Sequence, residues 1–118
     1  MCFPIFSAMT YKVNEFNVCE NATEYLIYQG NEGKVVLKTA FLDGKWRGGN
    51  SILCKNYGCG GLPSPNDKPF DTERECVENE LNWAENYLKS NGETRDFGKI
   101  FKLKLEELFP REQQLSLF

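Results

Sequence analysis

The residues of this chain that could act as nucleophiles, proton carriers or metal ligands are chiefly its cysteines and carboxylates. Histidine is absent from all 118 residues, which excludes a Ser-His-Asp triad, a Cys-His pair and most catalytic zinc sites. The five cysteines contain no CxxC pair: Cys2, Cys19, Cys54, Cys59 and Cys76. The opening residues lack the basic start and apolar run of a secretory signal, so we expect a cytoplasmic protein with reduced thiols. Buried free thiols are favoured over a four-cysteine zinc site.

Carboxylates offer the remaining route to catalysis. A magnesium-dependent nuclease gathers carboxylates around its metal ion, and Asp43, Asp67 and Asp71 are the candidates. Their order in the sequence follows no recognisable metal-binding arrangement. The glycine-rich stretch 58–61 is not followed by Gly-Lys-Ser/Thr, so no phosphate-binding loop is indicated. We therefore expect no metal and no cofactor, and the sequence favours a non-enzymatic protein over a small metal-dependent enzyme.

Basic residues are concentrated in one segment of a chain whose net charge is −3. Residues 34–55 contain Asp43 as their single acidic residue and five basic ones, Lys34, Lys38, Lys45, Arg47 and Lys55. A local basic patch matters more for nucleic-acid contact than the total charge does. These five residues are candidate phosphate contacts, and the alternative is an ordinary solvated face of a hairpin.

The last five residues combine one amide with three large apolar side chains: Gln114, Leu115, Ser116, Leu117 and Phe118. They follow a polar approach, Arg111-Glu112-Gln113. Chain termini are usually polar and poorly ordered unless something holds them. Two explanations are open: the apolar side chains pack on this protein's own core, or they fill a pocket of another protein.

This tail resembles the short peptide by which bacterial polymerases, repair proteins and replication regulators dock on the sliding clamp, the ring that encircles DNA. That motif has a Gln, a Leu, a small or acidic residue and then Leu-Phe, and residues 114–118 match each position. The resemblance implies that Leu115, Leu117 and Phe118 enter an apolar groove of the clamp. Gln114 would set the register by hydrogen bonding, and Ser116 would face water. The resemblance covers five residues, and no family is indicated for residues 1–109.

The rest of the sequence predicts one α+β domain over residues 1–109, followed by a flexible clamp-binding tail over 110–118. We expect an antiparallel sheet of about three to four strands packed on one main helix. Strands are indicated near 25–28, 34–41 and 45–54, with a hairpin turn at Asp43-Gly44 and a bulge or break at Gly48-Gly49. Residues 55–70 are expected to form a long irregular loop.

A capping box at Thr72 and Glu75 predicts that the main helix runs from about residue 73 to 90. Its buried face would carry Val77, Leu81, Ala84 and Leu88, widened by Cys76, Trp83 and Tyr87. Trp83 is expected to be a core anchor. Residues 96–109 suit either a helix or a strand, and we favour a strand near 99–103 that leads into a helical turn at 106–109.

These patterns favour an accessory or regulatory factor of DNA replication or repair that docks on the bacterial sliding clamp. A phage or mobile element is the kind of genome expected to encode it. The tail would either deliver the domain to DNA or block the clamp groove as an inhibitor. One alternative is a small DNA-binding module that uses the basic hairpin; the sheet and helix loosely resemble the three-stranded DNA-binding domains of integrases. Another is an anti-defence or inhibitor protein that binds a different bacterial protein through the glycine-rich loop. No membrane association is expected.

Overall fold

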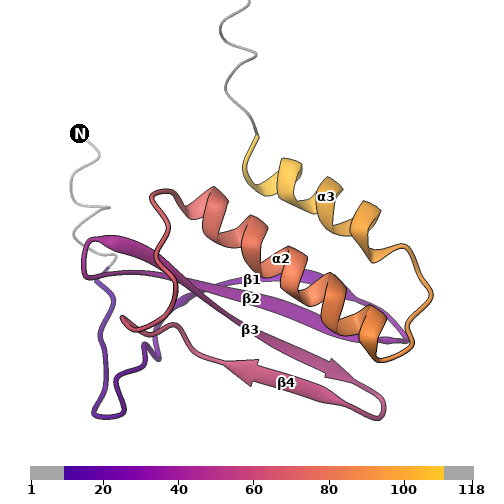
Figure 1. Ribbon diagram of the computed structural model, residues 1–118, viewed down its shortest axis with the longest axis horizontal. Helices are drawn as coiled ribbons and strands as arrows, with labels where there is room; N and C mark the ends of the chain where they lie inside the picture. The colour runs from indigo at the N-terminus through magenta and orange to yellow at the C-terminus, as the bar shows by residue number, and fades with distance from the viewer. Residues whose placement is uncertain (1–9, 111–118) are drawn as a thin grey trace, which may run out of the picture.

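In the computed structural model, which describes residues 10–110, a four-stranded antiparallel sheet is covered on one face by two helices (Figure 1). The strands lie in chain order: β1 Thr23–Gln29, β2 Gly33–Leu42, β3 Lys45–Cys54 and β4 Gly58–Gly61. Helix α2 (Glu73–Ser90) lies across β2 and β3, and helix α3 (Phe97–Leu108) packs beside α2. The predicted α+β class, with its antiparallel sheet on one main helix, is confirmed.

The hairpin between β2 and β3 follows from its turn residues. Asp43 and Gly44 both adopt positive φ angles, 54° and 77°, which match the right-handed twist of the two strands. The pairing then runs without interruption from Leu42 opposite Lys45 to Gly33 opposite Cys54. The expected bulge or break at Gly48-Gly49 is therefore wrong.

Gly48 is needed for the close approach of helix α2. A Cβ atom at Gly48 would lie 2.8 Å from Cys76 Sγ and 2.8 Å from Glu80 Cγ, closer than Cβ atoms come in real structures. Glycine thus lets the helix lie directly on β3 while the strand remains regular.

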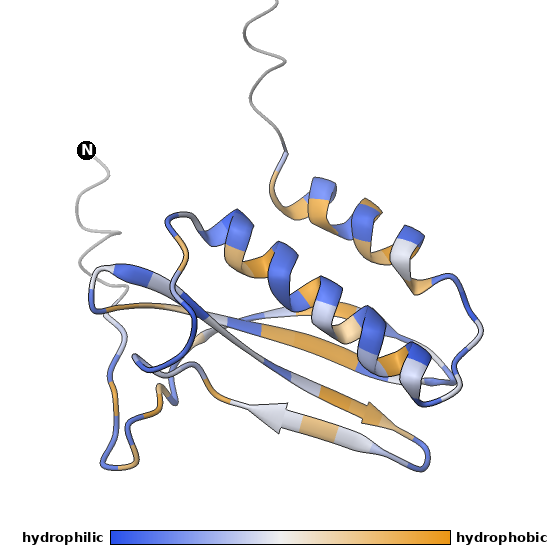
Figure 2. Ribbon diagram, viewed as in Figure 1, coloured by the Kyte–Doolittle hydropathy of each residue, from blue (hydrophilic) through white to orange (hydrophobic). Residues whose placement is uncertain are grey.

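The sequence-based prediction of one irregular loop over residues 55–70 is wrong in its first part. Gly58–Gly61 pairs with β3, with Leu53 opposite Gly58 and Asn50 opposite Gly61. Strand β4 has four residues, and three of them are glycine, so its sequence carries no alternating apolar pattern. This edge strand is therefore defined only by its backbone hydrogen bonds to β3. Figure 2 shows β4 at the edge of the sheet as largely white, in contrast to the long orange bands of the neighbouring strands.

The main helix matches its prediction at both ends. Thr72 and Glu75 form the reciprocal capping box, and the helix runs from Glu73 to Ser90. The five buried residues on its inner face are Cys76, Val77, Leu81, Ala84 and Leu88. Trp83 is different: its side chain is 46% exposed and is no core anchor.

The predicted strand at 99–103 is wrong, because residues 97–108 form one helix. Asp96 caps it by accepting a hydrogen bond from the Lys99 N–H at 3.1 Å. Phe97, Phe101 and Leu105 recur every four residues and are buried in the core, whereas Leu103 is 64% exposed. A period of four places these three side chains on one helical face.

The main core lies between the sheet and the two helices and contains Ile27, Val35, Leu37 and Ile52 from the strands. A second, smaller cluster lies on the opposite face, where residues 10–22 cover Ala40 and Leu42 with Cys19. The remainder of that opposite face, which carries Leu26, Val36 and Leu53, is left without a covering element among the described residues.

Candidate functional site

The attachment point of the C-terminal motif is fixed to the body of the protein. The Phe109 N–H donates to the Leu105 carbonyl at 2.8 Å, and the Phe109 carbonyl accepts from Arg74 Nη1. The other guanidinium nitrogen of Arg74 lies 2.7 Å from Glu106 Oε2, and the Phe109 ring packs edge-on against Tyr25 at 5.7 Å. Beyond this anchor, Pro110 is exposed. The predicted clamp-binding residues, Gln114, Leu115, Ser116, Leu117 and Phe118, lie outside the described residues.

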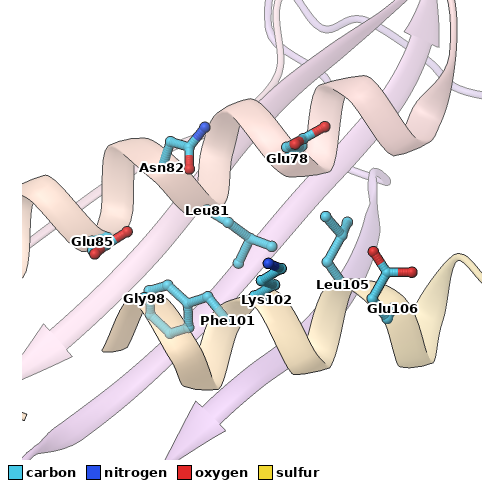
Figure 3. A pocket seen from close by; sticks show the side chains of 9 residues that line it. All are labelled: Glu78, Leu81, Asn82, Glu85, Gly98, Phe101, Lys102, Leu105 and Glu106. Carbon is cyan, nitrogen blue, oxygen red and sulfur yellow. The ribbon is translucent and has the colours of Figure 1, made fainter. Parts of the chain in front are cut away.

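A groove of about 200 Å³ runs between α2 and α3, next to this anchor (Figure 3). Its floor is formed by Leu81, Phe101 and Leu105, the side chains through which the two helices pack. The side chains at its rim are polar: Glu78, Asn82, Glu85, Lys102 and Glu106. Gly98 lets the helices approach here, because a Cβ atom on it would lie 2.5 Å from Glu85 Oε2.

The charges at this groove are largely compensated. Glu85 pairs with Lys89 at 2.9 Å, and this contact raises the pKa of the Lys89 ammonium. Glu106 pairs with Arg74, and Lys102 contributes a further positive charge. No hydroxyl or thiol occurs among the nine lining residues. The groove therefore combines an apolar floor with a largely charge-compensated rim, which suits polar contact with a surface.

The basic residues singled out from the sequence do not form one patch. Lys34 and Lys38 lie two positions either side of Val36 on the uncovered sheet face, where they line a shallow hollow of about 170 Å³. Glu24 is the cross-strand neighbour of Lys38. Lys55 is exposed in the turn that follows β3.

Lys45 and Arg47 both form polar contacts with other residues of the fold. Lys45 forms an ion pair with Asp71. Arg47 is only 8% exposed, and its guanidinium donates to the carbonyls of Leu42 at 3.3 Å and Asp67 at 2.6 Å. Since Arg47 closes the loop that follows β4 against the sheet, its role is structural.

The thiols of the described residues are unpaired. Cys19 and Cys76 are buried, Cys54 and Cys59 are half-buried, and Cys2 lies outside the described residues. Burial raises the pKa of the Cys76 thiol to about 12, with a further contribution from the neighbouring Glu80 charge. Burial thus keeps this thiol protonated and unreactive at neutral pH.

The candidate magnesium ligands are not brought together. Within residues 10–110, no group of three or more cysteine or acidic side chains is arranged to hold a metal ion. Asp71 instead pairs with Lys45, and Asp67 accepts a hydrogen bond from the Ser64 N–H at 2.9 Å.

A second cavity, which the sequence did not indicate, opens where β4 meets α2. Its lining includes the half-exposed Trp83, and Asn50 there donates to Glu80 at 3.0 Å. The paired glycines at 48–49 and 60–61 were the available signal, since tandem glycines often mark a close approach of the backbone to another group. The sequence instead predicts a bulge or break at the first pair and an irregular loop at the second.

No protein-family model, curated protein or solved structure matches this chain. No helix among residues 10–110 is long and apolar enough to cross a bilayer. A function therefore has to be inferred from the chemistry of the residues themselves.

Proposed function

We propose that this chain is an accessory or regulatory factor of DNA replication or repair that docks on the bacterial sliding clamp. The observation that carries the proposal is the sequence Gln-Leu-Ser-Leu-Phe at residues 114–118. Three apolar anchors and one amide in a short peptide are the kind of contact set that concentrates binding energy in a few buried side chains.

The anchor at Phe109 supports this proposal. Because Phe109 is held by Arg74 and Tyr25, the described body can keep its fold while residues 114–118 engage a partner. Three residues, 111–113, separate Pro110 from Gln114. The body would therefore be held close to the clamp surface.

Calorimetry with a purified bacterial clamp tests the proposal. The full chain is expected to bind with a dissociation constant near 1 μM or lower, a free energy of roughly −8 kcal/mol or stronger. Replacing Leu117 and Phe118 together by Ala should abolish the heat of binding, whereas Ser116→Ala is the matched control and should bind like the parent. Equal binding by the parent and the double-Ala variant would refute the assignment.

A primer-extension assay with a clamp-dependent polymerase separates recruitment from inhibition. If the tail only blocks the clamp groove, a synthetic peptide of residues 110–118 should inhibit as fully as the whole chain at equal occupancy. If residues 10–109 act on DNA or on another protein, the whole chain should change the reaction in a way that the peptide does not reproduce.

A second candidate function, DNA binding, is supported by Lys34 and Lys38 on the uncovered sheet face. Two phosphate contacts predict that log K falls with log salt at a slope of about −2, far from the slope of about −4.5 for all five basic residues. Replacing both lysines with Gln should remove the binding, and Lys45→Gln is the control. DNA binding unaffected by the paired substitution would exclude this face.

A further inference from the structure

The outer edge of β3 is paired at both ends and open in the middle. Trp46 exchanges two backbone hydrogen bonds with Phe70, at 2.9 and 3.0 Å, and Asn50 pairs with Gly61 of β4. Backbone groups on an antiparallel strand alternate in direction, so Gly48, midway between Trp46 and Asn50, directs its N–H and C=O toward this same edge. Figure 1 shows the chain leaving β4 and folding back over the sheet before α2 begins, and Leu62 and Asp67 of this segment lie at this part of the edge.

A cavity of about 360 Å³ occupies this position. Its walls are largely backbone, because four glycines line it: Gly48, Gly49, Gly60 and Gly61. The polar and aromatic side chains that line it are Asn50, Asp67, Glu80, Trp83 and Cys59, whose thiol donates to Asn50 Oδ1 at 3.6 Å. A flat planar group can therefore approach the strands closely and still reach polar atoms.

The cavity is negatively polarised. Asp67 and Glu80 carry carboxyl groups, and no basic side chain is among the lining residues. Glu80 Oε1 accepts from Asn50 Nδ2 at 3.0 Å, while Oε2 lies over the backbone of Gly48. Burial raises the pKa of the Glu80 carboxyl, the Asp67 charge raises it further, and the Asn50 hydrogen bond opposes both. A cation brought into the cavity would relieve this repulsion, whereas a phosphate or carboxylate would add to it.

The aromatic side of the cavity is held in a fixed orientation. Trp83 stacks on Tyr87, with ring centroids 5.2 Å apart and an angle of 11° between the rings. The indole is nevertheless 46% exposed and lines the cavity, so stacking on Tyr87 positions it without covering it completely. An indole face attracts organic cations and stacks well with a planar guanidinium.

We propose that this cavity binds a guanidinium group, presented by an arginine side chain of a partner protein or by a small free cation. The guanidinium would donate to the Glu80 carboxylate, stack on Trp83 and lie flat against the glycine backbone. A guanidinium has several N–H donors in one plane, so it can donate to a carboxylate oxygen and to the open carbonyl of Gly48 at the same time. A compact ammonium would form fewer of these hydrogen bonds. This inference does not depend on the clamp-binding tail.

Gly61 of β4 and Glu80 of α2 provide the variants for a test. Gly61 pairs with Asn50 and therefore faces the helix side of the sheet; a Cβ atom there meets nothing within 4 Å. Gly61→Val should fill the cavity without a clash. Glu78 is exposed on the same helix as Glu80 and is not among the residues that line the cavity, so Glu78→Gln is the matched control.

The experiment is a titration of the full chain with arginine amide, followed through the indole N–H signals of Trp83 and Trp46 in ¹⁵N-labelled protein. We expect a saturable shift confined to Trp83, with a dissociation constant on the order of 1 mM for so small a ligand. Citrulline amide, whose ureido side chain is neutral and of the same shape as the guanidinium, should bind at least tenfold more weakly. Gly61→Val and Glu80→Gln should lose the arginine amide response, and Glu78→Gln should keep it. Thermal unfolding of each variant confirms that it is folded.

Three results would overturn the proposal: equal responses to arginine amide and citrulline amide, an undiminished response in folded Gly61→Val, or no Trp83 shift at 20 mM ligand. Two further ligands identify the source of the cation. Methylguanidinium that binds as tightly as an acetylated Gly-Arg-Gly amide indicates a free small cation. At least tenfold tighter binding of the peptide indicates an arginine within a partner protein. Deleting residues 114–118 should leave all of these results unchanged, which separates this site from the clamp proposal.

Discussion

Glu73 joins helix α2 to the sheet through one carboxylate oxygen, and its removal should cost about 3 kcal/mol of unfolding free energy. Glu73 Oε2 accepts from the Tyr25 hydroxyl at 2.7 Å and from Thr39 Oγ1 at 2.8 Å. These two donors come from β1 and β2, while Glu73 is the first residue of α2. The contact therefore determines where the helix begins on the sheet.

The magnitude follows from the burial of the two hydroxyls. A hydrogen bond to a charged group contributes roughly 1.5–3 kcal/mol, and an abandoned buried donor costs roughly 1–3 kcal/mol. Thr39 is fully buried and would lose its partner completely, whereas the half-buried Tyr25 hydroxyl can recover part of its hydrogen bonding from water. We therefore expect Glu73→Ala to cost about 3 kcal/mol, within a range of about 2–5 kcal/mol.

Urea unfolding at pH 7 measures this cost, with Glu78→Ala as the control because Glu78 is exposed on the same helix. The control should stay within about 0.5 kcal/mol of the parent. Thr39→Val adds the pairwise test: in the double variant the loss should be smaller than the sum of the single losses by about 1 kcal/mol or more. A cost of under 1 kcal/mol for Glu73→Ala, or fully additive losses, would refute the reasoning.

Three other predictions concern α2 and the thiols near it. Thr72→Ala removes the hydrogen bond that the Thr72 side chain accepts from the Glu75 N–H in the capping box, and it should cost about 1 kcal/mol of unfolding free energy in the same assay. An unchanged unfolding free energy would show that the cap is dispensable. Iodoacetamide at pH 8 should label the half-buried Cys59 at least tenfold faster than Cys76, because burial raises the pKa of the Cys76 thiol to about 12. Peptide mass mapping measures the two labelling rates, and equal rates would contradict the burial of Cys76. Burial raises the pKa of the Glu80 carboxyl in the folded protein above its ordinary value of 4.5. The stability contributed by this shift is therefore fully present below pH 4.5, and it is lost as the pH rises through the pKa of the folded state. Glu80→Gln should therefore gain stability relative to the parent between pH 4 and pH 7.5, and a difference that does not vary with pH would contradict the shift.

The helix–strand ambiguity of residues 97–108 shows where sequence patterns reach their limit. Lys102 and Lys104 alternate with apolar neighbours as in a strand, yet Phe97, Phe101 and Leu105 form the buried helical face. Alternation over five residues fits a helix edge as well as a strand. The cap at Asp96 was the local signal that decides between them.

Helix α2 was predictable because two independent signals agree: its cap and its apolar stripe. Burial of a charged residue has no such local signal. Arg47 was grouped with exposed lysines by charge alone, and only the folding of the loop that contains Asp67 over β3 makes its guanidinium a structural donor. Likewise, Trp83 has the spacing of a core residue but lines the cavity beside the short glycine strand β4, and its side chain stays 46% exposed.

The proposed sites lie on different parts of the body. Because they are separate, binding at the tail can change how fully the weaker sites are occupied. Phe109 anchors the tail beside α3, the two lysines lie on the opposite sheet face, and the glycine-walled cavity opens at the sheet edge. Occupation of the clamp groove by residues 114–118 would therefore leave the lysine face and the cavity chemically intact. The chain from Pro110 to Gln114 spans at most about 14 Å when fully extended, so a clamp-bound body stays within a small volume. Short tethers give effective concentrations on the order of millimolar, enough to half-saturate a contact whose dissociation constant is about 1 mM. A weak arginine or phosphate contact, negligible for the free protein, would then be substantially occupied only at the clamp.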